Sequence, residues 1–427
     1  MAHRSFLARH RTPPFLLTLL LVLAAGCDAD SARSADGGAP PIIDDGGPPP
    51  GDSATPTPSA ESVEATLEHT EIVEAAGYDF AALNDALGAG ADTLGGGGGL
   101  LLIHEGRVVY RRTVGEAPEG GAFTPNTVVP LASASKWLSG GVVGALVDRG
   151  ELAWDTRAGE VFETWEGAKS RMTVAQLFSH TAGLNNGPEV HRIHRLDSMQ
   201  TAVDRIYAEV PMEYEPGTQL WYAGVGMQVV GRMAEIRHAR PWVEVADEVL
   251  FGPLGMSRTH YYGYVGANFE VPTDNPNVAG TAASSLNDYA RYVWMLQNDG
   301  IYGDARVLQP ETIEAMFTNR ADVEPQSVQL SPWDAYYDVA PEFADWRTGI
   351  GTWLYANGES GETEELISGG AWGCMPFIDR TRNLAGIYLP YQRERQASPS
   401  GRDRNPATVF WLDTVRPLIR AAVEARP

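Results

Sequence analysis

A serine and a lysine stand at the start of the most apolar helical segment of this chain. After Ser133, apolar residues recur at helical spacing up to Gly150, which is a typical helix stop: Trp137, Leu138, Val142, Val143, Leu146 and Val147. Lys136 lies three residues after Ser133, so both side chains share one face of the first turn. The segment therefore predicts a deeply buried helix that carries a polar pair at its N-terminus.

The chemistry of this pair suits an activated nucleophile. A hydroxyl is a weak nucleophile unless a base takes its proton, and a desolvated amine can serve as that base. The chain has 30 arginines but only two lysines, Lys136 and Lys169, and lysine alone of the two can accept a proton near neutral pH. The alternative is that Ser133 only caps the helix and Lys136 is a solvated surface residue. The spacing alone does not decide between these interpretations.

The N-terminus has the pattern of an export signal. Residues 1–11 are basic, Phe15 to Leu23 are apolar, and Ala24, Ala25 and Gly26 precede Cys27, which resembles a bacterial lipoprotein signal with its lipobox. The apolar run is too short to span a bilayer. We therefore expect a signal peptide at 1–26 and lipid on Cys27, which would anchor the protein to a bilayer on the extracytoplasmic face of a bacterial membrane, in the periplasm or at the cell surface. An ordinary cleaved signal peptide is the alternative.

Residues 27–70 are predicted to form a tether, because the segment up to about Ser62 is rich in Asp, Gly, Pro, Ser and Thr. The folded domain is expected at 71–427. If Cys27 carries lipid, Cys374 has no cysteine partner and is expected to be a small buried apolar side chain.

The net charge argues against nucleic acid as a ligand, and the sequence of the glycine run argues against a bound nucleotide. The formal net charge of −23 repels phosphate backbones, so nucleic acid is not an expected partner. The run Gly95 to Gly99 lacks the Gly-Lys-Ser/Thr ending of a phosphate loop, so no nucleotide cofactor is expected there.

Hydrophobic periodicity predicts strands at both ends of the domain and helices between them. A helix is expected at 78–87, a hairpin from 100–103 and 108–112, and a largely helical insert at about 156–272. Strand-like runs return at 349–356, 365–368 and 375–390, and a C-terminal helix at 406–425 has a break at Pro417.

Several ordered segments resemble one enzyme family. They are PLASASK around Ser133, MTVAQLFSHTAGL from Met172, YEPGTQLWYAG from Tyr214, FGPLGMSRTHY from Phe251, AGTAASSLNDYARYVWML from Ala279 and ISGGAWGCMPFID from Ile367. Over roughly 99–383 the chain resembles the serine β-lactamase and penicillin-binding-protein superfamily, in particular its class C-like branch with carboxylesterases and D-aminopeptidases. The resemblance implies an α+β, β-lactamase-like fold, in which helices flank an antiparallel sheet and a second subdomain is mostly helical.

The resemblance also implies roles for individual residues. Ser133 would be the acylated nucleophile, Lys136 its proton-shuttling partner, and Tyr222 a base that acts as a phenolate beside the lysine. The backbone N–H groups of Ser133 and Ala371 would form the oxyanion hole, and Gly369 and Gly370 would lie at a strand edge that substrate approaches closely. Neither a metal nor a cofactor is implied.

Two positions depart from the penicillin-recognising pattern. Gly224 stands where that pattern has an asparagine, and Ser368 stands where it has a lysine or histidine. An amide and a cation that would bind an acylamino carboxylate substrate are therefore missing, which favours small carboxylic esters as substrates. The alternatives are β-lactamase or D-Ala peptidase activity on an amide, and a catalytically inert binding protein on the same fold.

Other candidate residues are weaker. His180 invites a triad with Ser133, but the resemblance assigns its segment to a structural turn. His191 and His194 have the spacing of metal ligands, yet no third ligand is evident and their surroundings are polar. No G-x-S-x-G elbow occurs in the chain, which argues against an α/β-hydrolase.

Overall fold

The computed structural model describes residues 60–94, 96–184, 193, 198–263, 268–271, 273, 275–320, 328–329, 347–356, 363–392 and 406–426. All of them belong to the unit Pro56–Pro427. The predicted signal peptide, Cys27, and the histidines His191 and His194 lie outside the described residues. None of the helices in these ranges is both long and apolar enough to cross a membrane.

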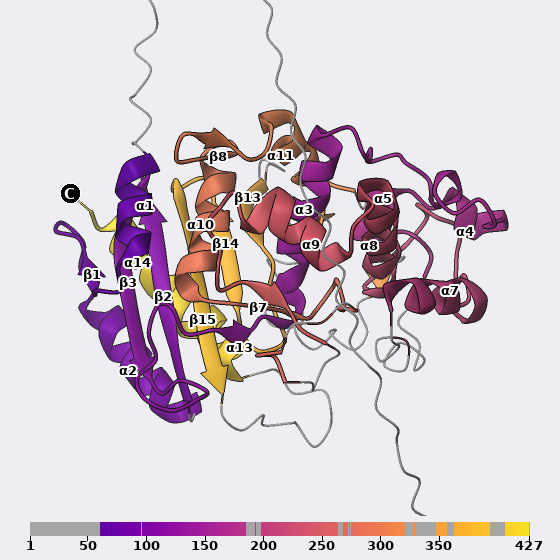
Figure 1. Cartoon of the computed structure of the whole chain (residues 1–427). Helices are drawn as coiled ribbons and strands as arrows, with labels where there is room; N and C mark the ends of the chain where they lie inside the picture. Colours follow the sequence, from indigo (N-terminus) through magenta and orange to yellow (C-terminus); the bar gives the residue numbers. More distant parts are fainter. Residues whose placement is uncertain are drawn as a thin grey trace, which may run out of the picture. The chain divides into compact units, whose positions relative to one another are not determined.

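An antiparallel sheet forms the centre of this unit (Figure 1). Within the described residues it has eight strands in the order β1-β3-β2-β15-β14-β13-β12-β11. The strands are β1 (Val73–Glu74), β2 (Gly96–His104), β3 (Arg107–Gly115), β11 (Arg347–Thr348), β12 (Trp353–Ala356), β13 (Thr363–Ile367), β14 (Met375–Asp379) and β15 (Leu384–Gln392). The first long strand, β2, pairs with the last, β15, from Gly96↔Gln392 to His104↔Leu384. The expected antiparallel sheet is thereby confirmed.

Gly96 to Gly99 of the glycine run are part of β2 and do not form a phosphate loop. A Cβ at Gly96 would lie 2.1 Å from the carbonyl oxygen of Tyr391, and one at Gly97 would lie 2.4 Å from that of Glu116. The neighbouring backbones approach so closely that only glycine fits at these two positions.

Helices cover both faces of the sheet, and alternate residues of β2 enter two different cores. Leu100 and Leu102 join a core with α2 and the C-terminal helices, whereas Leu101 and Ile103 face the core that contains Trp137. The helices concerned are α1 (Ala60–Glu68), α2 (Ala81–Leu94), α3 (Ser135–Asp148), α10 (Leu286–Gln297), α11 (Pro310–Met316), α13 (Pro406–Phe410), the π-helical η6 (Trp411–Val415) and α14 (Arg416–Glu424).

The predicted insert at 156–272 is mostly helical and lies to the right of the sheet in Figure 1. Its helices are η2 (Ala158–Glu160), α4 (Gly167–Arg171), α5 (Val174–Phe178), α7 (Met199–Glu209), α8 (Val225–His238), α9 (Trp242–Ala246) and the π-helical η3 (Asp247–Phe251). Short strands complete the described elements: β4 (Val129–Pro130), β5 (Leu220–Trp221), β6 (His260–Tyr261), β7 (Ala282–Ser284), β8 (Ile301–Tyr302), β9 (Ala305–Arg306) and β10 (Val328–Gln329). Strands β4, β7 and β6 form one small antiparallel sheet.

Helix α3 is buried along almost its whole length, as its sequence predicts. It is preceded by the 3₁₀ turn η1 (Ala132–Ala134) and is followed by Gly150, whose φ of +71° suits the residue after a helix. Two glycines inside the helix permit this packing, because a Cβ at Gly141 would lie 2.6 Å from the Tyr292 ring and one at Gly140 would lie 2.8 Å from the carbonyl oxygen of Ile350.

Three predicted boundaries differ from the structure. Helix α1 begins at Ala60, inside the predicted tether 27–70, and its Val63 and Leu67 are buried, so the folded domain starts before residue 71. The run 375–390 is two strands, β14 and β15, because the chain reverses at Arg380–Asn383. The helix expected at 78–87 occupies Ala81–Leu94 instead.

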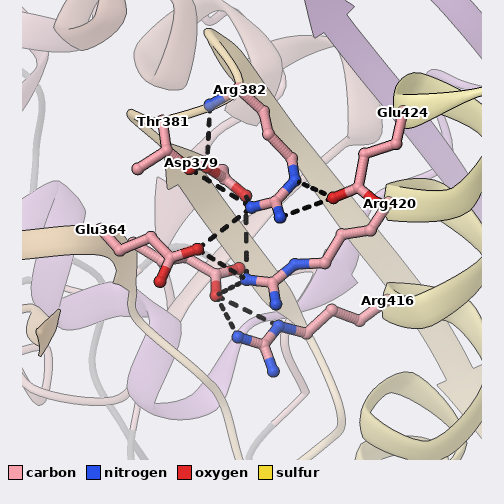
Figure 2. A network of polar contacts seen from close by, with 8 residues as sticks. Glu364, Asp379, Thr381, Arg382, Arg416, Arg420 and Glu424 are labelled. Atoms are coloured by element: carbon pink, nitrogen blue, oxygen red, sulfur yellow. Dashed lines mark hydrogen bonds and ion pairs between the residues drawn. The ribbon is translucent and has the colours of Figure 1, made fainter. Parts of the chain in front are cut away.

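An ion-pair network fastens α14 to the sheet (Figure 2). Glu365 of β13 is almost fully buried and accepts hydrogen bonds from Arg416 and, at 3.1 Å, from Arg420. Arg382 contacts Asp379 at 2.9 Å and Glu424 at 2.6 Å, and these acids raise the pKa of its guanidinium. Because Pro417 stands in the first turn of α14, where its missing N–H costs nothing, the predicted break is the start of a new helix.

Candidate active site

The chain turns sharply just before Ser133. Ala132 has a φ of +49°, in the left-handed region that non-glycine residues seldom adopt. Ser135 Oγ donates to the carbonyl oxygen of Ala132 at 2.6 Å and accepts from the backbone N–H of Ala282 at 2.9 Å. This buried hydroxyl therefore ties the strained turn to strand β7 and holds Ser133 at the start of α3.

Lys136 is buried, and its ammonium group has two acceptors. Nζ donates to Ser133 Oγ at 2.9 Å and to the carbonyl oxygen of Ala279 at 2.8 Å. The two side chains that the helical spacing placed on one face are thus in direct contact. This lysine is not the solvated surface residue of the alternative interpretation.

Tyr222 reaches the same hydroxyl from the helical insert. It follows β5 directly, and its phenol donates to Ser133 Oγ at 2.8 Å. The Tyr222 ring centroid lies 4.9 Å from Lys136 Nζ. Ser133, Lys136 and Tyr222 therefore converge, although 86 residues separate the lysine from the tyrosine.

His180 lies beside Tyr222 and is buried. The two ring centroids are 4.6 Å apart, and Trp353 of β12 stacks near both rings. Nδ1 of His180 lies 3.0 Å from the carbonyl oxygen of Ala223. Burial, with a smaller contribution from the nearby Lys136 charge, lowers the pKa of His180 to about 3, so its imidazole is neutral at physiological pH.

The segment ISGGAWGCMPFID, which begins at Ile367, lies against the turn that carries Ser133. A Cβ at Gly370 would be 2.1 Å from the carbonyl oxygen of Leu131, which explains why glycine stands there. Ser368 is buried, and its hydroxyl donates to the carbonyl oxygen of Gly351 at 2.9 Å. Gly369 and Ala371 follow in the same connection between β13 and β14.

Gly224 is enclosed by the segment that holds Lys136. It is the N-cap of α8, and a Cβ placed on it would lie 2.9 Å from the Cβ of Ala279. A side chain at position 224 must therefore displace the segment whose carbonyl oxygen binds the lysine.

The described residues contain no group of three or more His, Cys, Asp and Glu side chains that could hold a metal ion. Cys374 is buried, and burial raises the pKa of its thiol, as expected for a small apolar core residue.

Three contributors escaped the sequence analysis. Ser135 and Ala279 act through short backbone-linked hydrogen bonds, and Trp353 through ring stacking, so none of them has a diagnostic residue type at a fixed spacing. Ser135 lies in PLASASK and Ala279 begins AGTAASSLNDYARYVWML, so their place in segments that resemble the enzyme family could have indicated a role in the site.

The arrangement can move a proton from the serine hydroxyl. Ser133 Oγ lies within 3 Å of both an amine and a phenol, at the N-terminus of a buried 14-residue helix whose dipole favours negative charge. Such a constellation is suited to nucleophilic attack followed by proton return.

Comparison with known proteins agrees with this geometry. The Beta-lactamase family model matches residues 89–407. Penicillin-binding protein 4 of Amycolatopsis lactamdurans is 28% identical over 324 residues, which cover 67% of this chain and 85% of that protein.

Solved structures share the fold. A candidate beta-lactamase of Bacteroides dorei DSM 17855 superposes with a TM-score of 0.67 at 25% identity, over 81% of this chain and 99% of that one. A family VIII carboxylesterase superposes with a TM-score of 0.60 over 84% of this chain and 100% of its own; at 19% identity this similarity concerns the fold alone.

Proposed function

Because this chain belongs to the beta-lactamase family of serine hydrolases and has the β-lactamase-like fold, we propose that it hydrolyses small carboxylic esters through an acyl-enzyme on Ser133. The observation that carries the proposal is the pair of hydrogen bonds that Ser133 Oγ accepts from Lys136 and Tyr222.

The reaction requires the Tyr222–Lys136 pair to have lost one proton, so that Ser133 can donate its hydroxyl proton to the pair instead of only accepting from it. In the proposed mechanism Ser133 Oγ then attacks the ester carbonyl carbon while its proton passes to this pair. The developing oxyanion is bound by the backbone N–H groups of Ser133 and Ala371. The pair then protonates the leaving alcohol, which leaves an acyl group on Ser133. A water molecule gives a proton to the same pair and attacks the acyl carbon; the bond between that carbon and Ser133 Oγ then breaks, Ser133 Oγ takes the proton back from the pair, and the acid is released.

The preference for esters rests on Gly224 and Ser368. Ser368 is buried against Gly351, and Gly224 is closed off by Ala279, so neither position offers an amide or a cation to a substrate. A β-lactam brings an amide and a carboxylate that must leave water, and each unpaired group costs about 1–3 kcal/mol. A neutral ester brings neither group.

The test compares two substrates on one preparation. We expect kcat/KM for p-nitrophenyl butyrate to exceed that for a chromogenic cephalosporin by roughly two to four orders of magnitude, and a fluorophosphonate probe to label Ser133. Ser133→Ala should abolish both turnover and labelling. Ser139→Ala, which removes a nearby serine hydroxyl in α3, is the control and should still be labelled.

A faster cephalosporin reaction would favour the second candidate, a β-lactamase or D-Ala peptidase acting on an amide. The names of two relatives support that candidate: penicillin-binding protein 4 of Amycolatopsis lactamdurans and a candidate D-alanyl-D-alanine carboxypeptidase of Escherichia coli K12. Absence of both turnover and adduct would leave an inert binding protein.

We also propose that the protein is exported and anchored through lipid on Cys27, as the sequence around that residue suggests. Cys27→Ser should move the protein from the membrane fraction to the soluble extracytoplasmic fraction. Unchanged membrane association of this variant, with no lipid on the N-terminal peptide, would rule the anchor out.

A further inference from the structure

His180 contacts Tyr222 and also the residues immediately before and after it. Its backbone carbonyl oxygen accepts a hydrogen bond from the N–H of Trp221 at 2.8 Å, and its Nδ1 contacts the backbone of Ala223. These are the residues immediately before and after Tyr222. The imidazole ring packs on the tyrosine ring between these two attachments, at 4.6 Å between centroids.

The backbone of His180 is bent to make these contacts. Its φ of +63° lies in the left-handed region, where a residue other than glycine is strained. The turn that carries it begins at the end of α5, and the phenol of Tyr214 also reaches the His180 carbonyl oxygen at 3.4 Å. Strain kept beside a reacting group is often associated with function.

We propose that His180 is a positioning residue, which holds the Tyr222 phenol against Ser133 and takes no part in proton transfer itself. This inference rests on the proposed hydrolase function. The ring faces Tyr222 and Trp353, and its Nδ1 is engaged by Ala223. Its lowered pKa keeps it uncharged, so it adds no second cation beside Lys136.

The test measures the rate at which a fluorophosphonate labels Ser133, and both kcat and KM for p-nitrophenyl butyrate. A positioning role predicts that the labelling rate and kcat fall while KM changes little. His180→Asn loses the ring but tolerates the left-handed backbone, and His180→Phe keeps the ring but loses the contact with Ala223. We expect labelling and kcat to fall about tenfold or more in His180→Asn and less in His180→Phe, with KM within about threefold.

The matched control is Ser179→Ala. Ser179 is buried in the same turn and contacts the hydroxyl of Thr181 at 3.0 Å, so its removal weakens the turn without touching Tyr222. We expect the control to lower the melting temperature but to change the labelling rate less than about twofold.

The possible results distinguish the positioning role of His180 from the proposed hydrolase function. Unchanged labelling in both His180 variants, a change confined to KM, or an equal loss in Ser179→Ala would overturn the positioning role while leaving the hydrolase intact. A wild-type protein that is not labelled overturns both proposals. Either His180 variant alone is sufficient for the comparison if the other does not fold.

Discussion

Individual backbone atoms determine how the side chains of the proposed catalytic group are held. Ser133 Oγ accepts from Lys136 and Tyr222, while the lysine is held in turn by the carbonyl oxygen of Ala279. That carbonyl belongs to the residue whose Cβ closes the space above Gly224. A departure from the penicillin-recognising pattern at position 224 is therefore linked by contact to the lysine, and the two cannot be changed independently.

The first prediction concerns this link. Gly224→Ala places a Cβ 2.9 Å from that of Ala279, so the segment must shift and Lys136 loses its alignment. We expect kcat for p-nitrophenyl butyrate to fall about tenfold. Ala279→Gly added to this variant removes the overlap and should recover most of the loss, which a double-mutant cycle measures as coupling. Full activity of Gly224→Ala would contradict the account.

It follows that substituting the asparagine and lysine of the penicillin-recognising pattern at positions 224 and 368 would disturb the surrounding structure. Gly224→Asn meets the same overlap, and Ser368→Lys would put an ammonium group where a buried hydroxyl now contacts Gly351. We expect this double variant to lose hydrolysis of esters without gaining cephalosporin turnover.

Among the elements, α14 is fastened to the sheet by ion pairs in addition to its buried apolar residues Ile419, Ala422 and Val423. Its arginines Arg416 and Arg420, both labelled in Figure 2, reach the buried carboxylate of Glu365 on β13. Removing one partner of a buried ion pair leaves the other charge uncompensated, which costs far more than losing an exposed pair.

Glu365→Ala should accordingly lower the free energy of unfolding by about 3–5 kcal/mol in urea titration. The matched control is Glu314→Ala, which removes an exposed partner 3.7 Å from Arg380 and should cost less than about 1 kcal/mol. Similar losses in both variants would show that the network does not anchor α14.

On the scale of the whole molecule, the site draws on three parts of the fold. Ser133, the proposed nucleophile, stands just before α3, Tyr222 comes from the helical insert, and Gly370 of the connection between β13 and β14 packs on the turn that carries Ser133. Because groups of the site are buried within the folded domain, their protonation affects the free energy of unfolding. His180 allows this effect to be measured.

Stability should fall with acid because of His180. Its folded-state pKa of about 3 lies below the ordinary 6.5, so between these values the unfolded chain binds a proton that the folded chain does not. Its contribution is fully present above pH 6.5 and is lost as the pH falls. From pH 7.5 to 5.0 we expect the wild type to lose about 2 kcal/mol more than His180→Asn in urea titrations; parallel curves would contradict this.

The sequence alone determined what depends on short-range geometry. The helical period placed Ser133 and Lys136 together, apolar periodicity revealed the burial of α3, and Gly150 marked its end, because these relations span a few residues of one element. Tertiary structure alone decided that Ala279 holds the lysine, that Ser368 faces inward, that α1 joins the core and that His180 packs on Tyr222. Those contacts join residues of different segments, for example 17 positions apart for Ser368 and Gly351 and 143 for Lys136 and Ala279, and their geometry follows from how whole elements pack rather than from any local spacing.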